Sequence, residues 1–193
     1  ADNMAASEET EGDRNSILVR YVVGKMSGAA LDEVQFQTAA FCILGILDID
    51  PAAVGFQPHI YGPRSELLDA KRRELEEGCA RVFPALSEVS SLVPPLMNMD
   101  GLIRSMVETT RSFTDEELLL MTYCDFEKGA EGSCILASDV KDDVLARRVD
   151  IAIGMYHEER VSLARGAELA GMPLGEFQNE LVDRFGYVCT LRL

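Results

Sequence analysis

Basic side chains are scarce in this sequence of 193 residues. It has 18 lysines and arginines against 33 aspartates and glutamates, so the formal net charge is −15 at pH 7. Proteins that bind nucleic acid through their own surface usually gather lysine and arginine to neutralise phosphates. Residues 1–140 hold 11 basic and 24 acidic side chains, a net charge of −13, whereas residues 141–193 hold 7 and 9, a net charge of −2. We therefore expect any DNA contact to lie in residues 141–193.

Paired cysteines and histidine clusters are also absent. The five cysteines are scattered, none lies in a CxxC pair, and there are only two histidines. A structural zinc site normally needs four cysteine or histidine ligands in close pairs. We therefore predict no metal site and no cofactor. Cys42 and Cys189 lie in apolar runs and are expected to be small buried hydrophobic residues.

Long apolar runs are missing too. The longest, around residues 39–47, is far short of the roughly 20 residues that span a bilayer. No basic segment is followed by the apolar core of a signal peptide. We expect a cytoplasmic protein with no membrane partner. Because tryptophan is absent and aromatic residues make up 7%, the core must consist mainly of Leu, Val, Ile, Ala and Met, which suits helices.

Motifs of catalysis and cofactor binding are not found: there is no GxxxxGK[ST] or GxGxxG loop, no GxSxG elbow and no HExxH. Acidic pairs such as Asp142 and Asp143 are typical of helix caps and solvated faces. We predict that the chain is not an enzyme. One alternative stays open, a small hydrolase or nuclease that uses clustered Asp and Glu with a metal ion.

The order of periodic segments and breakers predicts a mainly α chain with minor β. Residues 1–14 are expected to be a disordered acidic tail, residues 15–83 a winged-helix-like module, residues 84–113 a connector with an amphipathic helix, and residues 114–193 a helical domain. The pattern predicts helices over about 16–26, 31–47, 64–77, 99–107, 118–126 and 138–158, a short strand within 54–61 and a closing strand over 187–193.

The most informative segment is residues 161–184, whose spacing predicts a helix-turn-helix. Ser162 can cap a short helix, Gly171 supplies the tight turn, and Pro173 suits the first turn of the next helix. Ala167 is expected where the two helices cross closely, since only a small side chain fits there. The shared apolar interior would come from Leu163, Ala170, Met172, Phe177 and Leu181.

The helix-turn-helix also supplies candidate contact residues. Glutamine, asparagine and arginine are the side chains that usually recognise base edges, and arginine also contacts phosphates. Opposing this, Glu176, Glu180 and Asp183 would face a phosphate-lined groove unfavourably. Two interpretations stay open: the segment contacts DNA or a protein partner, or it is a packing or dimerising element. The candidate contact residues are Arg160, Arg165, Leu174, Gln178, Asn179 and Arg184.

Two segments resemble known families. Residues 161–188 (VSLARGAELAGM…EF…L…RFGYV) resemble an uncharacterised family of short prokaryotic antitoxin-like helix-turn-helix proteins, whose ending has the form ISLGKAAELAGMSREEFLELLAERGI. Residues 56–69 (FQPHIYGPRSELLD), preceded by residues 36–47, resemble the winged-helix-type Panacea (SocA-like) antitoxin domain. This chain departs from the second pattern at two positions. It has His59 where the family has its first aromatic residue, and Arg64 where the family commonly has a bulky residue. The turn with His59, Tyr61 and Arg64 is a candidate docking surface.

Both resemblances imply regulatory proteins that bind other proteins or DNA, and neither implies catalytic residues. We therefore expect a non-enzymatic regulator of the antitoxin or transcription-regulator type. Its partner would be a protein, either a toxin or a second copy in a homodimer, with DNA as a further candidate. The alternative is an acidic protein-interaction scaffold that does not bind DNA.

Overall fold

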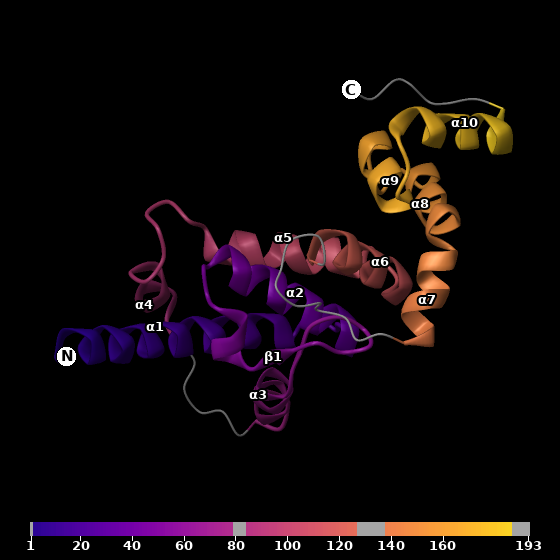
Figure 1. Ribbon diagram of the computed structural model, residues 1–193. Coiled ribbons are helices and arrows are strands. Elements are labelled where there is room, and N and C mark those ends of the chain that lie inside the picture. The colour runs from indigo at the N-terminus through magenta and orange to yellow at the C-terminus, as the bar shows by residue number, and fades with distance from the viewer. Residues whose placement is uncertain (1, 79–83, 127–137, 187–193) are drawn as a thin grey trace. The chain divides into compact units, whose positions relative to one another are not determined.

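Helices account for most of the chain, as predicted, and a two-stranded antiparallel sheet accounts for the minor β part among the described residues (Figure 1). The structure is a computed structural model and describes residues 2–78, 84–126 and 138–186, with side chains from residue 11 onward. It divides into two units, Ala1–Asp115 and Glu116–Leu193. None of the described helices is long and apolar enough to cross a membrane.

Unit 1 contains two long helices, a hairpin and shorter helices. Its elements are α1 (Asp2–Ser27), α2 (Glu33–Ile46), the 3₁₀ helix η1 (Pro51–Val54), β1 (Phe56–Gln57), β2 (Arg64–Ser65), α3 (Glu66–Glu76), α4 (Leu86–Ser90) and α5 (Met99–Arg111). Helix α1 packs against α2, α3 and α5, and α2 also packs against α5. The core is aliphatic with few aromatic rings, as the composition predicts; its fully buried side chains include Leu18, Val22, Phe36, Ile43 and Leu68.

The first helix begins earlier than predicted. The prediction of a disordered tail over residues 1–14 is wrong for residues 2–14, because α1 is continuous from Asp2 to Ser27. Proline is absent from this stretch, and its alanines and glutamates have high helix propensity. Acidic residues near a helix N-terminus also interact favourably with the helix dipole. Arg14 holds α1 to the rest of unit 1, since its guanidinium donates to the carbonyl oxygens of Leu47 and Leu92, each at 3.1 Å.

Residues 84–113 belong to the core of unit 1 and are not a connector between domains. Val89, Met99 and Ile103 are almost fully buried. The prolines suggested a linker, but the apolar stripe of the following amphipathic helix packs on α2. The boundary between units falls after Asp115, two residues beyond the predicted one.

A buried phenol joins the first and fifth helices. The Tyr21 hydroxyl donates to Asp100 Oδ1 at 2.5 Å, and Lys25 Nζ lies 3.2 Å from the same oxygen. Burial, with the adjacent carboxylate, raises the pKa of Tyr21 above its usual value. The hydrogen bond from Tyr21 lowers the pKa of Asp100, so this carboxylate stays ionised at neutral pH.

The predicted strand within 54–61 is much shorter in the structure. Phe56 pairs with Ser65 and Gln57 pairs with Arg64, and the ladder extends no further. Val54 lies in η1, and Gly55 ends that helix in the left-handed conformation at φ 73°. After Gln57, Pro58 has no N–H to donate to a ladder, so the strand stops there.

Unit 2 consists of α6 (Asp115–Phe126), whose first residue is the last of unit 1, and α7 (Asp139–Ala146), α8 (Arg148–His157), α9 (Leu163–Ala170) and α10 (Leu174–Phe185). The single helix predicted over 138–158 is interrupted at Arg147, whose φ and ψ are −103° and 8°. Neither glycine nor proline lies at this bend, so no breaker in the sequence marks it. The predicted loop after Phe126 and the predicted closing strand lie outside the described residues.

The predicted pair of helices over 161–184 is found as α9 and α10. Ser162 caps α9 by accepting a hydrogen bond from the Arg165 N–H, and Gly171 ends it at φ 70°. Arg148 adds a second cap, because its Nε donates to the Leu169 carbonyl at 2.8 Å. The helices leave no room for a side chain at Gly166, one residue before the predicted Ala167. A Cβ at Gly166 would lie 2.8 Å from two ring carbons of Phe177.

Gly166→Ala should destabilise unit 2, because the added methyl group must displace the Phe177 ring. We expect a loss of about 1–2 kcal/mol in the free energy of unfolding, overpacking being partly offset by the higher helix propensity of alanine. Urea denaturation followed by circular dichroism measures this loss. Gly175→Ala is the matched control, since nothing lies within 4 Å of its Cβ position; it should stabilise by about 0.5–1 kcal/mol. Equal effects of the two changes would contradict the close crossing.

Candidate functional site

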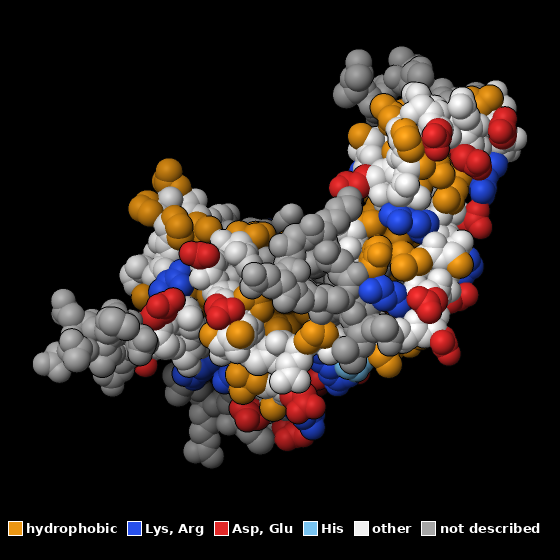
Figure 2. Space-filling model, in the orientation of Figure 1, with side chains coloured by type: hydrophobic (Ala, Val, Ile, Leu, Met, Phe, Trp, Pro, Cys, Tyr) orange, Lys and Arg blue, Asp and Glu red, His pale blue; other side chains and the backbone are white. Residues whose placement is uncertain are grey.

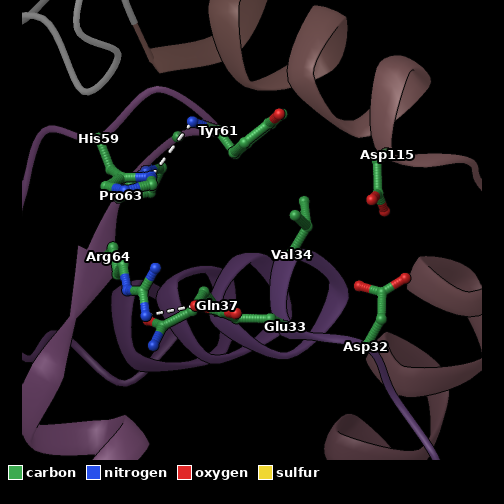
Figure 3. A pocket seen from close by; sticks show the side chains of 10 residues that line it. Asp32, Glu33, Val34, Gln37, His59, Tyr61, Pro63, Arg64 and Asp115 are labelled. Carbon is green, nitrogen blue, oxygen red and sulfur yellow. Dashed lines mark hydrogen bonds and ion pairs between the residues drawn. The ribbon is translucent and has the colours of Figure 1, made fainter.

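The predicted docking turn forms one wall of a pocket in unit 1. The pocket has a volume of about 400 Å³, within the range of small-ligand sites. His59, Tyr61 and Arg64, the three residues predicted from the sequence, all line it (Figure 3). The rest of its lining is Asp32, Glu33, Val34, Gln37, Gly62, Pro63 and Asp115.

Local hydrogen bonds hold the turn in place. The Tyr61 N–H donates to His59 Nδ1 at 3.4 Å, and the Gly62 N–H donates to the His59 carbonyl at 3.2 Å. Gly62 has φ 97°, a conformation that favours glycine. Gly62 and Pro63 are buried, whereas the Tyr61 side chain beside them is 44% exposed. The turn therefore presents the tyrosine ring at the mouth of the pocket.

A buried polar network fastens the turn to α2. Gln37 Nε2 donates to the Ser65 carbonyl at 3.0 Å, and Gln37 Oε1 accepts from the Ser65 N–H at 3.0 Å. The Ser65 hydroxyl donates to the Val54 carbonyl at 2.6 Å and accepts from the Leu68 N–H, so it also caps α3. Gln37 and Ser65 are both buried, and the network satisfies their polar atoms.

The charge of Arg64 is neutralised within the network. Its Nε and Nη2 donate to Asp69 Oδ2 at 3.2 and 3.0 Å, and Nη2 also pairs with Glu33. The second oxygen of Asp69 accepts from Gln37 Nε2 at 2.7 Å. Arg64 therefore serves to hold the pocket wall, and its charge has two carboxylate partners already.

Two carboxyl groups face one another on the other side of the pocket. Asp32 caps α2 by accepting from the Gln35 N–H at 2.8 Å, and Asp115 is the first residue of α6 (Figure 3). Partial burial, followed by the charge of Asp32 and a hydrogen bond with it, raises the pKa of Asp115. Within the described part of the chain, no lysine or arginine forms an ion pair with either group.

Asp115→Asn should stabilise the protein at neutral pH. A raised folded-state pKa means that Asp115 contributes fully to stability below its unfolded pKa, near 3.8, and that this contribution is lost as pH rises through the folded pKa. Removing the charge should raise the free energy of unfolding by less than about 1 kcal/mol at neutral pH, because the site is partly exposed. Below about pH 3 the difference should vanish. Denaturation curves across this pH range test the sign, and a neutral-pH loss of stability would contradict it.

All three arginines predicted to contact DNA or a partner are ion-paired within unit 2. Arg165 pairs with Asp125 and with Glu168, both at 2.7 Å. Arg184 pairs with Asp150 at 2.6 Å, and its Nε lies 3.5 Å from Glu180. Arg160, between α8 and α9, pairs with Glu117 and Glu158.

The pair of Arg160 with Glu117 is the most buried of the three. Nη1 and Nη2 of Arg160 both donate to the Glu117 carboxylate, with Nη2 at 2.6 Å from Oε1. Only 10% of the Glu117 side chain and 21% of the Arg160 side chain are exposed. The hydrogen bonds with Glu117 raise the pKa of Arg160 even though partial burial alone would lower it. This forked geometry ties the loop before α9 to α6.

The outer side of α10 is apolar and acidic. Leu174, Val182 and Phe185 are 46%, 45% and 38% exposed, and Phe185 stacks on His157 with ring centroids 4.6 Å apart. Asn179 is exposed and Gln178 is half-buried. Figure 2 shows acidic and hydrophobic side chains beside one another over this part of the unit. Residues 116–193 carry 8 basic and 15 acidic side chains, a net charge of −7, so the helix pair lies in an acidic unit.

Glu117→Gln should destabilise unit 2 by about 2–3 kcal/mol, because it leaves the partly buried Arg160 without its main counter-charge. Thermal or chemical unfolding measures the loss. Glu158→Gln is the matched control: Glu158 pairs with the same arginine but is 62% exposed, so its removal should cost less than about 1 kcal/mol. An equal loss of stability in the two variants would contradict the larger contribution proposed for the pair of Arg160 with Glu117.

Several residues that build these sites were not predicted. Gln37 is a polar residue beside the apolar Phe36 and Ala40 of α2, and this position could have identified it. Asp32 could have been found as a helix cap, since it forms a capping box with Gln35. Nothing in the sequence brings Asp115 to Asp32. Cys42 is half-buried rather than buried, Cys124 is buried, and Cys189 lies outside the described residues.

Among the described residues, no group of three or more His, Cys, Asp or Glu side chains lies close enough to hold a metal ion. Comparisons with models of protein families, with curated proteins and with solved structures find no match to this chain.

Proposed function

We propose that the chain is a non-enzymatic regulatory protein, of the antitoxin or transcription-regulator type, that acts by contact with a protein partner through α10. One observation carries this proposal: the arginines that would neutralise DNA phosphates are paired internally, whereas α10 exposes Leu174, Val182 and Phe185. Solvent-exposed apolar side chains beside charged ones are typical of protein-contact surfaces.

The charge of the unit supports a protein partner. An acidic surface repels the phosphate backbone, whose neutralisation supplies most of non-specific DNA affinity. Breaking an internal ion pair to free Arg165 for a phosphate would expose Asp125 and Glu168 to the same groove. A basic or apolar protein surface faces neither cost. The partner would be a toxin-like protein or a second copy of the chain.

We also propose that unit 1 is a winged-helix-like module of the Panacea type. Its support is the resemblance of residues 56–69 together with the short hairpin β1–β2 placed between α2 and α3. In this reading unit 1 supplies protein contact or dimerisation, and the resemblance of residues 161–188 assigns an antitoxin-like role to the α9–α10 pair.

DNA contact by α10 is the second candidate, and the geometry of the helix pair favours it. A close crossing at Gly166 and a left-handed turn at Gly171 are the requirements of a helix-turn-helix that enters a major groove. Asn179 on the exposed side is a side-chain type that reads adenine.

A copurification experiment with the tagged full chain from its native cells tests the main proposal. The wild type should retain a protein in stoichiometric amount, and Leu174→Ser/Val182→Ser should weaken that binding about 10–100-fold, as expected for losing two exposed apolar contacts. Leu67→Ser, an equally exposed leucine of α3, is the matched control and should bind like the wild type.

The salt dependence of duplex binding distinguishes DNA contact from protein contact. If DNA is the partner, affinity for a duplex should fall steeply between about 50 and 200 mM salt, and Arg165→Glu should weaken it. That result, together with unchanged protein binding by the serine variant, would contradict the main proposal. Salt-insensitive or absent duplex binding would remove the DNA candidate.

A further inference from the structure

The pocket of unit 1 carries negative charge that its own cation does not balance. Arg64, the cationic residue of the lining, is held by Glu33 and Asp69 on the side of the hairpin. Asp32 and Asp115 lie on the opposite side, where their carboxyl groups face one another. Placing two carboxyl groups together is unfavourable unless a proton or a cation lies between them.

The remaining walls suit an organic cation. The Tyr61 ring and the Val34 side chain extend into the space between the turn and the two aspartates (Figure 3). Tyrosine faces attract guanidinium and ammonium groups, and apolar contact at Val34 would cover the aliphatic stem of such a side chain. A hard divalent cation would instead need about six oxygen ligands, and it gains nothing from an aromatic wall.

We propose that this pocket binds the guanidinium group of an arginine side chain from a protein partner. A planar guanidinium can donate to both carboxylates at once while one face lies against Tyr61, which a point-charged ammonium does less well. The pocket volume of about 400 Å³ exceeds that of one side chain, so the flanking backbone of the partner also fits. This inference rests on the proposed function in one respect, that the chain acts by protein contact.

A bound guanidinium group would account for two features of the pocket together. The acidic pair would gain a counter-charge, and the exposed Tyr61 would gain a stacking partner. It also places a basic contact in unit 1, separate in its residues from the apolar contact proposed for α10.

The test uses the full chain labelled with ¹⁵N and two small probes, N-acetylarginine methylamide and N-acetylcitrulline methylamide. The second has nearly the same shape but no charge. The arginine probe should shift the amide signals of Val34, Tyr61 and Gly62 and saturate in the millimolar range, and the citrulline probe should bind at least about 5-fold more weakly.

Variants locate the binding. Asp115→Asn should weaken the arginine probe about 5-fold, and Tyr61→Leu about 3-fold. Glu74→Gln removes one exposed acidic charge on α3, away from the pocket lining, and should bind the probe like the wild type. Comparable binding of both probes, binding that survives Asp115→Asn unchanged, or no shift of the pocket signals would each overturn the inference.

The same probe distinguishes this inference from the proposed function. Leu174→Ser/Val182→Ser changes α10 only, so it should bind the arginine probe normally even if it loses the protein partner. A wild type that ignores the probe yet retains its partner through α10 would refute the pocket and leave the proposed function standing.

Discussion

The exchange of two hydrogen bonds between the Gln37 side chain and the Ser65 backbone is the interaction on which the pocket depends. The Gln37 side-chain amide pairs with the Ser65 N–H and C=O much as a neighbouring strand would. The hairpin has only two residue pairs, and this amide satisfies the edge of β2. Because these groups are buried, a missing partner would cost the desolvation of each one. The network therefore has one favourable arrangement, and that arrangement fixes the turn over the start of α2.

From this anchor the other pocket residues follow in order. Ser65 caps α3. Asp69, on the first turn of α3, accepts hydrogen bonds from Gln37 and Arg64, and Arg64 also pairs with Glu33 at the start of α2. Each member thus satisfies its neighbour, which is the condition under which a buried polar cluster stabilises a fold rather than weakening it. The acidic pair on the opposite side has no part in this network of hydrogen bonds and ion pairs.

Local signals in the sequence were sufficient for most helices and for the position of the docking turn. Ser162 caps its helix where the pattern places it, and Gly171 makes the predicted turn. Misassignments arose where tertiary packing decides. Residues 84–113 look like a linker by composition but are buried by α2, and the close crossing is at Gly166 because the Phe177 ring needs a neighbour without a side chain.

The charge of the helix pair shows why residue type alone did not determine its role. Arg160, Arg165 and Arg184 suggested a surface for phosphates, but each has an acidic partner on another helix or in its own turn. The net charge of −2 for residues 141–193 also left out the acidic residues of α6, which belong to the same unit as these arginines. Pairing is a property of the folded unit and cannot be counted from the sequence.

The border between the units falls at the first residue of a helix and not in a loop. Asp115 contributes its carboxyl group to the pocket, while Glu116 and Glu117, its immediate neighbours, hold Arg147 and Arg160. A fragment of the amino-terminal half that stops at the preceding turn would lack half of the acidic pair, and one that stops at Asp115 would leave this residue on a frayed end. Anyone dissecting the protein would have to retain several turns of α6 in both halves, so the two fragments must overlap in sequence.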